Sequence, residues 1–224
     1  MENVITYEFA GHTATVIRPE HPNGKWIWKT EFLYAFDAAE RALLAEGYTR
    51  VYYRLSDQYG CDRAVRQMHA FHRDVTRRFG LCREAILFGF SRGGLYAFRY
   101  ALFYPEYVTK VYLDAPVLDM RTWPRPGTRE YPEMLAACGL DEVTLREETA
   151  HPIGHLEEFF SLGIPLLVVA GGADEVVPFA DNAGRLLVYA KEHGISVPSV
   201  VKPTCGHHPH SLEDVTPILD FVRK

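Results

Sequence analysis

The chain has 224 residues, 47% of them hydrophobic, and a formal net charge of −5 at pH 7. This is ample material for a large core, and an acidic balance without a Lys/Arg block argues against a nucleic-acid partner. No apolar run approaches the roughly 20 residues that cross a bilayer, so no membrane partner is expected. The N-terminus lacks a signal-peptide pattern, and the four cysteines show no C-x-x-C spacing. We therefore expect a cytoplasmic protein with free thiols, a single domain over residues 1–224.

The first part of the chain predicts an edge hairpin and then a strand–helix alternation. Two β-prone runs, 5–9 and 13–18, are joined by a short turn, which is typical of an antiparallel hairpin. Residues 19–28 contain two prolines, a glycine and two tryptophans and are predicted as a loop. Apolar residues at helical spacing predict a helix over 31–46, and a strand is expected over 51–55.

The middle of the chain continues this alternation. A second helix is predicted from Asp62 to a C-terminal cap at Gly80, with His69 and His72 as surface or rim histidines. The apolar run 85–88 predicts a buried strand, and residues 95–104 predict a helix that Pro105 stops.

After a strand at 108–113, the alternation is interrupted. The segment of about residues 116–162 holds five prolines and one helical stretch near 133–138, so we expect a cap-like insertion, too short to bury its own core. The rhythm resumes with strands at 165–170 and 197–202 and helices at 178–193 and from Thr216 onward. This order predicts an α/β fold with a mostly parallel sheet covered on both faces.

The sequence Gly89-Phe90-Ser91-Arg92-Gly93-Gly94 lies between the buried strand at 85–88 and the helix at 95–104. A strand, a tight turn with a central serine and a helix form the arrangement called a nucleophile elbow. Glycines two residues either side of Ser91 give the turn room, and the backbone N–H of Arg92 points where an oxyanion would form. A Gly-rich turn with an incidental serine is the alternative. The flanking strand and helix favour the nucleophile.

A serine nucleophile needs a histidine base and an acid that orients it, and parallel sheets gather such groups at the carboxyl ends of strands. Asp174 follows the strand at 165–170, and histidines follow the strand at 197–202. The order Ser…Asp…His is that of the elbow enzymes. Asp114, which also ends a strand, is the alternative acid, although a structural role or a substrate contact is the preferred prediction for it.

The histidine segment Cys205-Gly206-His207-His208-Pro209-His210 also admits a metal site. Adjacent histidines rarely both reach one ion, and no second ligand cluster is evident. The prediction is therefore no metal and no cofactor.

Together, GFSRGG, GGADEVVP and CGHHPH resemble the α/β-hydrolase superfamily over nearly the whole chain. More narrowly, GFSRGGLYAFRYA, YLDAPVLDMRTWP and GHHPHSLEDVTPILDF resemble a bacterial group of small hydrolases often linked to carbohydrate breakdown. The superfamily commonly carries Gly-His after its last strand, which implies His207 as the base, with His208 as the reserve. It also implies a second oxyanion donor near Lys25 or Trp26, although the usual His-Gly start of that loop is absent.

The expected activity is that of a serine esterase acting on a small acyl or methyl ester, with a carbohydrate as one carrier. Its small-molecule substrate is expected to contact aromatic and polar side chains, namely Trp28, Tyr59, Asp114, Trp123 and His208, with packing as the alternative role for the aromatics. A non-hydrolytic member of the fold, a lyase or a ligand-binding receptor, is the alternative function. The substrate and the oligomeric state are left open.

Overall fold

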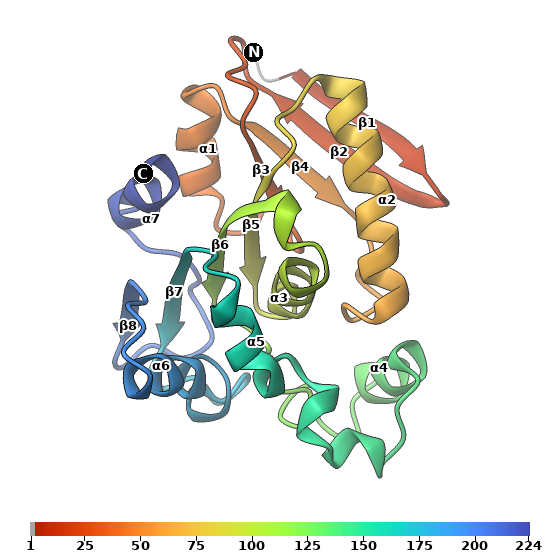
Figure 1. The fold of residues 1–224 in the computed structure, drawn as a ribbon, viewed down its shortest axis with the longest axis vertical. Helices are drawn as coiled ribbons and strands as arrows, with labels where there is room; N and C mark the ends of the chain where they lie inside the picture. The colour runs from red at the N-terminus through yellow and green to blue at the C-terminus, as the bar shows by residue number, and fades with distance from the viewer. Residues whose placement is uncertain (1–2) are drawn as a thin grey trace.

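A computed structural model describes residues 3–224 of the chain. The eight strands of the described part form one sheet in the order β1-β2-β4-β3-β5-β6-β7-β8 (Figure 1). Strands β1 and β2 form the expected antiparallel hairpin, β2 also pairs antiparallel with β4, and every other neighbouring pair is parallel. The strands are β1 (Asn3–Phe9), β2 (His12–Arg18), β3 (Trp26–Lys29), β4 (Thr49–Tyr53), β5 (Ala85–Phe90), β6 (Val108–Asp114), β7 (Leu166–Gly171) and β8 (Ser199–Lys202).

Helices cover both faces of this sheet, with α1 and α7 on one side and α2, α3 and α6 on the other (Figure 1). The α-helices are α1 (Ala38–Ala45), α2 (Asp62–Phe79), α3 (Gly93–Phe103), α4 (Glu130–Cys138), α5 (Leu156–Ser161), α6 (Ala183–Glu192) and α7 (Thr216–Arg223). Short 3-10 helices occur at Pro105–Tyr107, Thr144–Arg146, Glu148–Ala150, Pro152–His155 and Phe179–Asp181.

Each face of the sheet has its own apolar core. One core joins Phe88 and Val169 of the sheet to Leu43 of α1 and Ile218 of α7. The larger core packs the opposite face against α2 and α3. The strands β5 and β7 are buried along their whole length, as expected of central parallel strands with helices on both sides.

The prediction of a loop over residues 19–28 is wrong at its C-terminal end, because Trp26–Lys29 forms β3 between β4 and β5. The strand has only four residues and directly follows a segment with Pro19, Pro22 and Gly24, residues that are typical of loops. The sequence pattern therefore predicts a loop throughout. Strand β3 matters for the site, because its carboxyl end lies beside that of β5.

The predicted helix over residues 31–46 forms only from Ala38 onward. Residues 31–37 are irregular, with Phe32 and Phe36 at φ +58° and +50°, values that a helix does not contain. Lys29, itself buried, donates a 3.1 Å hydrogen bond to the carbonyl of Ala35 and pairs with buried Glu40. These long side-chain contacts hold the segment away from the helical conformation that its apolar spacing favours.

The segment between β6 and β7 lies beyond the carboxyl ends of the central strands (Figure 1). It contains α4, α5 and three of the 3-10 helices, more regular structure than the one helical stretch predicted. Its buried side chains, such as Met134, Ile153 and Phe159, join the larger core of the sheet. The cap segment, residues 115–165, therefore packs onto the rest of the molecule through a shared core.

The prediction of His72 as a surface or rim histidine is wrong, since its side chain is buried beside the larger core. Its Nε2–H donates to the carbonyl of Arg83 at 2.6 Å, and its Nδ1 accepts from the hydroxyl of Tyr100 at 2.8 Å. Burial lowers the pKa of His72 to about 4.

Within residues 3–224, none of the helices combines the length and the apolar character that a bilayer crossing requires.

Candidate active site

Ser91 lies in a strained turn between β5 and α3. Its backbone adopts φ +50°, a left-handed conformation that is uncommon for a residue other than glycine. Two backbone hydrogen bonds of 2.9 Å hold the turn. The N–H of Ser91 donates to the carbonyl of Asp114, and the N–H of Gly94 donates to the carbonyl of Ser91. Strain of this kind persists where the surrounding structure imposes it, and it is concentrated at functional sites.

The glycines around Ser91 have no space for a side chain. A Cβ on Gly89 would lie 2.8 Å from the Cβ of Ala97 on α3, and one on Gly93 would lie 2.9 Å from Oγ1 of Thr30. Thr30 directly follows β3, so the turn is packed between its own helix and the loop after the neighbouring strand.

Ser91, His207 and Asp174 form a continuous hydrogen-bonded chain. Oγ of Ser91 lies 2.9 Å from Nε2 of His207, and Nδ1 of His207 lies 2.7 Å from Oδ2 of Asp174. An ionised carboxylate only accepts hydrogen bonds, so Nδ1 carries the proton and Nε2 accepts from the serine hydroxyl. This is the tautomer that a general base for Ser91 requires.

Asp174 is held as a carboxylate by its own loop. Its Oδ1 accepts the backbone N–H groups of Val176 and Val177 at 2.9 and 3.0 Å. Burial by itself would raise the pKa of Asp174, but the hydrogen bonds from His207 and these two amides outweigh it and hold the pKa below its usual value.

The loops that carry Asp174 and His207 are packed backbone against backbone. The N–H of Ala173 donates to the carbonyl of Cys205 at 3.0 Å, and that of Gly172 donates to Lys202 at 2.8 Å. A Cβ on Gly171 would lie 2.0 Å from the carbonyl oxygen of Gly206. Glycine at 171 therefore permits the close approach that brings the acid within reach of the histidine.

A second Asp–His pair lies beside the first. Nδ1 of His210 lies 2.8 Å from Oδ1 of Asp114, whose Oδ2 accepts from the hydroxyl of Tyr112 at 2.6 Å and from the N–H of Ser211 at 2.8 Å. Asp114 is only 1% exposed and both of its carboxylate oxygens already accept hydrogen bonds, so the structure places this predicted substrate contact in the interior of the protein. In the described residues Asp114 makes no hydrogen bond to His207, and Asp174 makes that bond.

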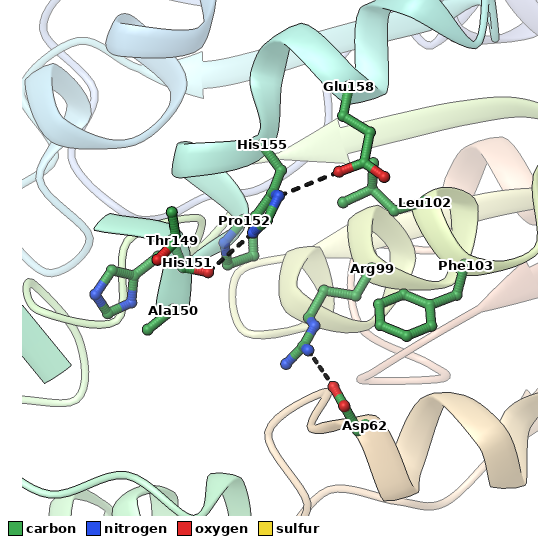
Figure 2. A pocket seen from close by; sticks show the side chains of 10 residues that line it. All are labelled: Asp62, Arg99, Leu102, Phe103, Thr149, Ala150, His151, Pro152, His155 and Glu158. Atoms are coloured by element: carbon green, nitrogen blue, oxygen red, sulfur yellow. Dashed lines mark hydrogen bonds and ion pairs between the residues drawn. The ribbon is translucent and has the colours of Figure 1, made fainter. Parts of the chain in front are cut away.

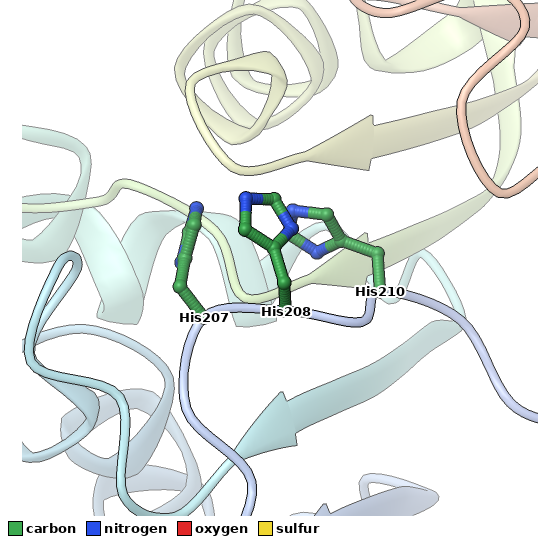
Figure 3. A group of neighbouring side chains, drawn as sticks. All are labelled: His207, His208 and His210. Atoms are coloured by element: carbon green, nitrogen blue, oxygen red, sulfur yellow. The ribbon is translucent and has the colours of Figure 1, made fainter.

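His208, the reserve base, is exposed and bonds to neither Ser91 nor Asp174 in the described part of the chain. Its ring stacks on that of Phe36, with the centroids 5.9 Å apart. Figure 3 shows the three histidines side by side on one loop at the carboxyl edge of the sheet.

Trp26 is excluded as an oxyanion donor. It begins β3, is fully buried, and its Nε1–H donates to the carbonyl of Cys82 at 2.9 Å. Its neighbour Ile27 pairs with Ile86, and Ser91 lies roughly 17 Å further along the strand direction. Lys25, the other candidate, precedes Trp26 and is excluded for the same reason. Both candidates depend on the prediction of residues 19–28 as a loop, whereas the loop after β3 begins only at Thr30.

The N–H of Arg92, by contrast, lies at the start of α3 and has no hydrogen-bond partner within residues 3–224. Free N–H groups are characteristic of a helix N-terminus, where they can bind an anion. The loop after β3 lies close to the start of α3. A Cβ on Gly93 would lie only 3.5 Å from the backbone nitrogen of Glu31 in that loop.

Glu31, which belongs to no sequence motif, is buried beside the elbow. Its Oε2 accepts from Arg92 at 3.3 Å and from Ser56 at 3.1 Å, and its Oε1 has no partner within residues 3–224. Burial raises the pKa of Glu31, with Arg92 and Ser56 opposing the effect. The guanidinium of Arg92 also lies 5.3 Å from the ring centroid of Phe32. No sequence pattern marks this contact, since residues 31, 56 and 92 meet only through the fold.

The predicted substrate contacts divide into core and surface residues. Trp28 is buried against Trp26 and Tyr100, and Tyr59 is 1% exposed and donates to Glu133 at 3.2 Å, so neither lies open to a ligand. Trp123 is half-buried and lines a cavity of about 360 Å³ together with Glu175 and Val176, the two residues after Asp174.

Another cavity, of about 420 Å³, lies between α2, α3 and the cap segment (Figure 2). Its lining includes the Arg99–Asp62 ion pair and Leu102 near the end of α3, roughly 15 Å along that helix from Ser91. None of Ser91, Asp174 and His207 lines it. This cavity is therefore separate from the candidate active site.

The strand order, the elbow after β5 and the loops after β7 and β8 define the α/β-hydrolase fold. Two solved structures with this arrangement support the assignment. Acylaminoacyl peptidase from Pyrococcus horikoshii superposes with a TM-score of 0.69 at 14% identity, covering 100% of this chain and 40% of the peptidase. A structure described as that of a proposed esterase from Staphylococcus aureus superposes with a TM-score of 0.68 at 13% identity, covering 92% of this chain and 76% of that one.

The chain thus spans two fifths of the length of the peptidase that it resembles. No family model and no curated protein sequence matches it. The likeness is therefore one of fold alone.

Proposed function

We propose that the protein is a serine hydrolase that cleaves a small ester through Ser91, His207 and Asp174. The observation that carries this proposal is the unbroken chain of hydrogen bonds from Oγ of Ser91 to Oδ2 of Asp174, at 2.9 and 2.7 Å. A serine with only a structural role does not require both a strained backbone and a hydrogen bond to a histidine whose tautomer is that of a general base.

In the proposed reaction, Oγ of Ser91 attacks the ester carbonyl while Nε2 of His207 takes its proton. The oxyanion that forms accepts the N–H of Arg92 and one backbone N–H of the Glu31–Phe32 segment after β3. His207 then gives its proton to the departing alkoxide, which leaves as the alcohol and yields an acyl-enzyme. A water molecule, deprotonated by His207, releases the acid and regenerates the serine hydroxyl.

Asp174 contributes without exchanging a proton. Its carboxylate keeps the proton of His207 on Nδ1 and stabilises the imidazolium that forms when Nε2 is protonated. Its two backbone hydrogen bonds, from Val176 and Val177, keep the carboxylate oriented through the cycle.

The proposed substrate is a small acyl or methyl ester, with a sugar as a suitable carrier. The cavity lined by Trp123, Glu175 and Val176, the last two of which directly follow Asp174 in the chain, offers the ring of Trp123 and the half-exposed side chain of Val176 as apolar contacts. The loop after β3 adds Phe32 and Phe36, both more than one third exposed. Flat apolar faces of this kind suit a sugar ring or an aryl group.

Labelling by a fluorophosphonate probe, combined with hydrolysis of p-nitrophenyl acetate and of acetylated and methyl-esterified sugars, tests the proposal. Ser91→Ala should abolish labelling and lower kcat by about 10⁴-fold or more. Ser161→Ala, which removes an exposed hydroxyl on α5, is the matched control and should behave as wild type. A Ser91→Ala variant that retains more than about a tenth of the wild-type rate would overturn the assignment.

A non-hydrolytic role, as a lyase or a receptor, is the alternative for this fold. It predicts no covalent labelling of Ser91 and no turnover of any ester in the panel. The probe experiment therefore separates the two functions directly.

A further inference from the structure

Three histidine nitrogens gather at one point of the candidate active site. The rings of His207, His208 and His210 lie 4.8 to 4.9 Å apart, centroid to centroid. Each ring offers one nitrogen, and these three atoms all lie within 4.8 Å of one another. Figure 3 shows the three side chains rising from the same loop on the same side.

Two of these rings are already oriented as metal-binding histidines are. Nδ1 of His207 bonds to Asp174 and Nδ1 of His210 bonds to Asp114, so the lone pair of each ring is on Nε2. Histidines that bind zinc almost always donate their other nitrogen to a carboxylate or carbonyl in this way, which fixes the tautomer and strengthens the ligand. Both carboxylates are almost completely buried.

His208 is the exposed member of the three. Its side chain is exposed and makes no hydrogen bond within residues 3–224, with ring contacts to Phe36 and the two other histidines as its restraints. Zinc–nitrogen bonds of about 2.0–2.1 Å in a tetrahedral site put the nitrogens roughly 3.3 Å apart. The three nitrogens, all within 4.8 Å of one another, are thus at most about 1.5 Å wider apart than a bound ion requires. Small side-chain adjustments close this gap, and the exposure of His208 gives an ion access from solvent.

We infer that His207, His208 and His210 form a binding site for a divalent transition-metal ion such as Zn²⁺, which holds three imidazole nitrogens and leaves its fourth position open. The objection from sequence was that adjacent histidines rarely reach one ion. Here the loop turns so that the side chains at 207, 208 and 210 converge. Nε2 of His207 cannot both bind the ion and accept the proton of Ser91, so the ion blocks the proposed hydrolysis. Only that last consequence rests on the proposed function.

Isothermal titration calorimetry with ZnCl₂ tests the site on the full chain after chelator treatment. Wild type should bind one ion, and Ser91→Ala should bind at least as tightly, because no ligand is lost. His208→Ala should weaken binding by at least tenfold, and Asp114→Asn by about 10–100-fold through the loss of support for His210. His193→Ala, which removes an exposed histidine at the end of α6, should leave binding unchanged.

Two outcomes would overturn the inference. One is the absence of zinc binding by wild type at micromolar concentrations. The other is full affinity in His208→Ala together with lost affinity in Cys205→Ser, which would move the site to the neighbouring thiol.

The hydrolysis assay separates this inference from the proposed function. Zinc should inhibit ester hydrolysis with a constant that matches the calorimetric affinity and shifts with it in His208→Ala. Zinc binding without any esterase activity would leave the site standing and count against the hydrolase. Ester hydrolysis without zinc binding would do the reverse.

Discussion

The molecule contains two Asp–His pairs of nearly the same geometry, and they differ in what lies beyond the histidine. Asp174–His207 and Asp114–His210 join oxygen to nitrogen at 2.7 and 2.8 Å, and each aspartate lies at the carboxyl end of a central strand, β7 and β6. Nε2 of His207 lies 2.9 Å from Oγ of Ser91, whereas His210 has no such partner among the described residues. An Asp–His hydrogen bond alone therefore does not identify a catalytic base.

The two carboxylates also differ in their other partners. Asp174 accepts backbone N–H groups of its own loop, which leaves the acid and His207 as one local unit. Asp114 accepts Tyr112 from its own strand and Ser211 from the loop after β8, and so ties that loop to the sheet. We interpret Asp114–His210 as the support that holds His207 in register with Ser91.

Replacement of each histidine in turn should separate the two pairs. His207→Ala should lower kcat by about 10⁴- to 10⁶-fold, because the base is lost while the fold is not. His208→Ala and His210→Ala should each cost far less, which steady-state kinetics on the same ester will measure. Equal and severe losses in His207→Ala and His208→Ala would leave the base unassigned.

Neutralising the two acids should separate their effects on catalysis. Asp174→Asn should lower kcat by about 10⁴-fold, since an amide favours the wrong tautomer of His207, whereas Asp114→Asn should lower kcat far less. Each variant should lower the free energy of unfolding by about 2–3 kcal/mol, because each carboxylate is buried and accepts three hydrogen bonds. Kinetics and urea unfolding on both variants provide the test, and a severe loss of kcat in Asp114→Asn alone would exchange their roles.

A milder change should loosen the contact that brings acid and base together. In Gly171→Ala the new Cβ would overlap the carbonyl of Gly206, so we expect a loss of about 3 kcal/mol in stability and a lower kcat. Gly206→Ala is the matched control, because its Cβ would meet no atom nearer than 3.9 Å. If both variants were equally stable, the backbone contact would not be what sets the distance between the loops.

The smallest expected effect concerns a histidine outside both pairs. His72 has a folded-state pKa of about 4 and a usual value of 6.5, so below pH 6.5 the unfolded chain takes up a proton that the folded chain does not. Its contribution to stability is complete above pH 6.5 and falls by about 1.4 kcal/mol per pH unit toward pH 4.

Between pH 7.5 and pH 5 the free energy of unfolding should therefore drop by about 2 kcal/mol through His72 alone. His72→Gln, measured by urea unfolding at both pH values, should show a correspondingly shallower drop. An unchanged drop would assign the acid sensitivity to other groups, including the two Asp–His pairs.

Local patterns in the sequence were enough to predict most elements of the sheet and the elbow. Helix α2, from Asp62 to the cap at Gly80, and strands β5 and β7 formed where their apolar periodicity indicated, because long periodic segments bury one definite face. The α/β-hydrolase fold follows from that alternation and from the glycines around Ser91, which no other residue type could replace in so tight a turn.

Tertiary contacts decided what lies around Ser91. Strand β3 and the irregular loop after it depend on pairing with β4 and β5 and on buried Lys29 and Glu31, which no local pattern encodes. The sequence alone already favours Asp174 over Asp114 as the orienting acid, because its loop opens with two glycines and follows the strand next to the one that precedes the histidines. The distance from Asp174 to His207 depends on the packing of Gly171 against Gly206, because the spacing of two loops is set by the backbone contacts between them and not by the residues of either loop alone.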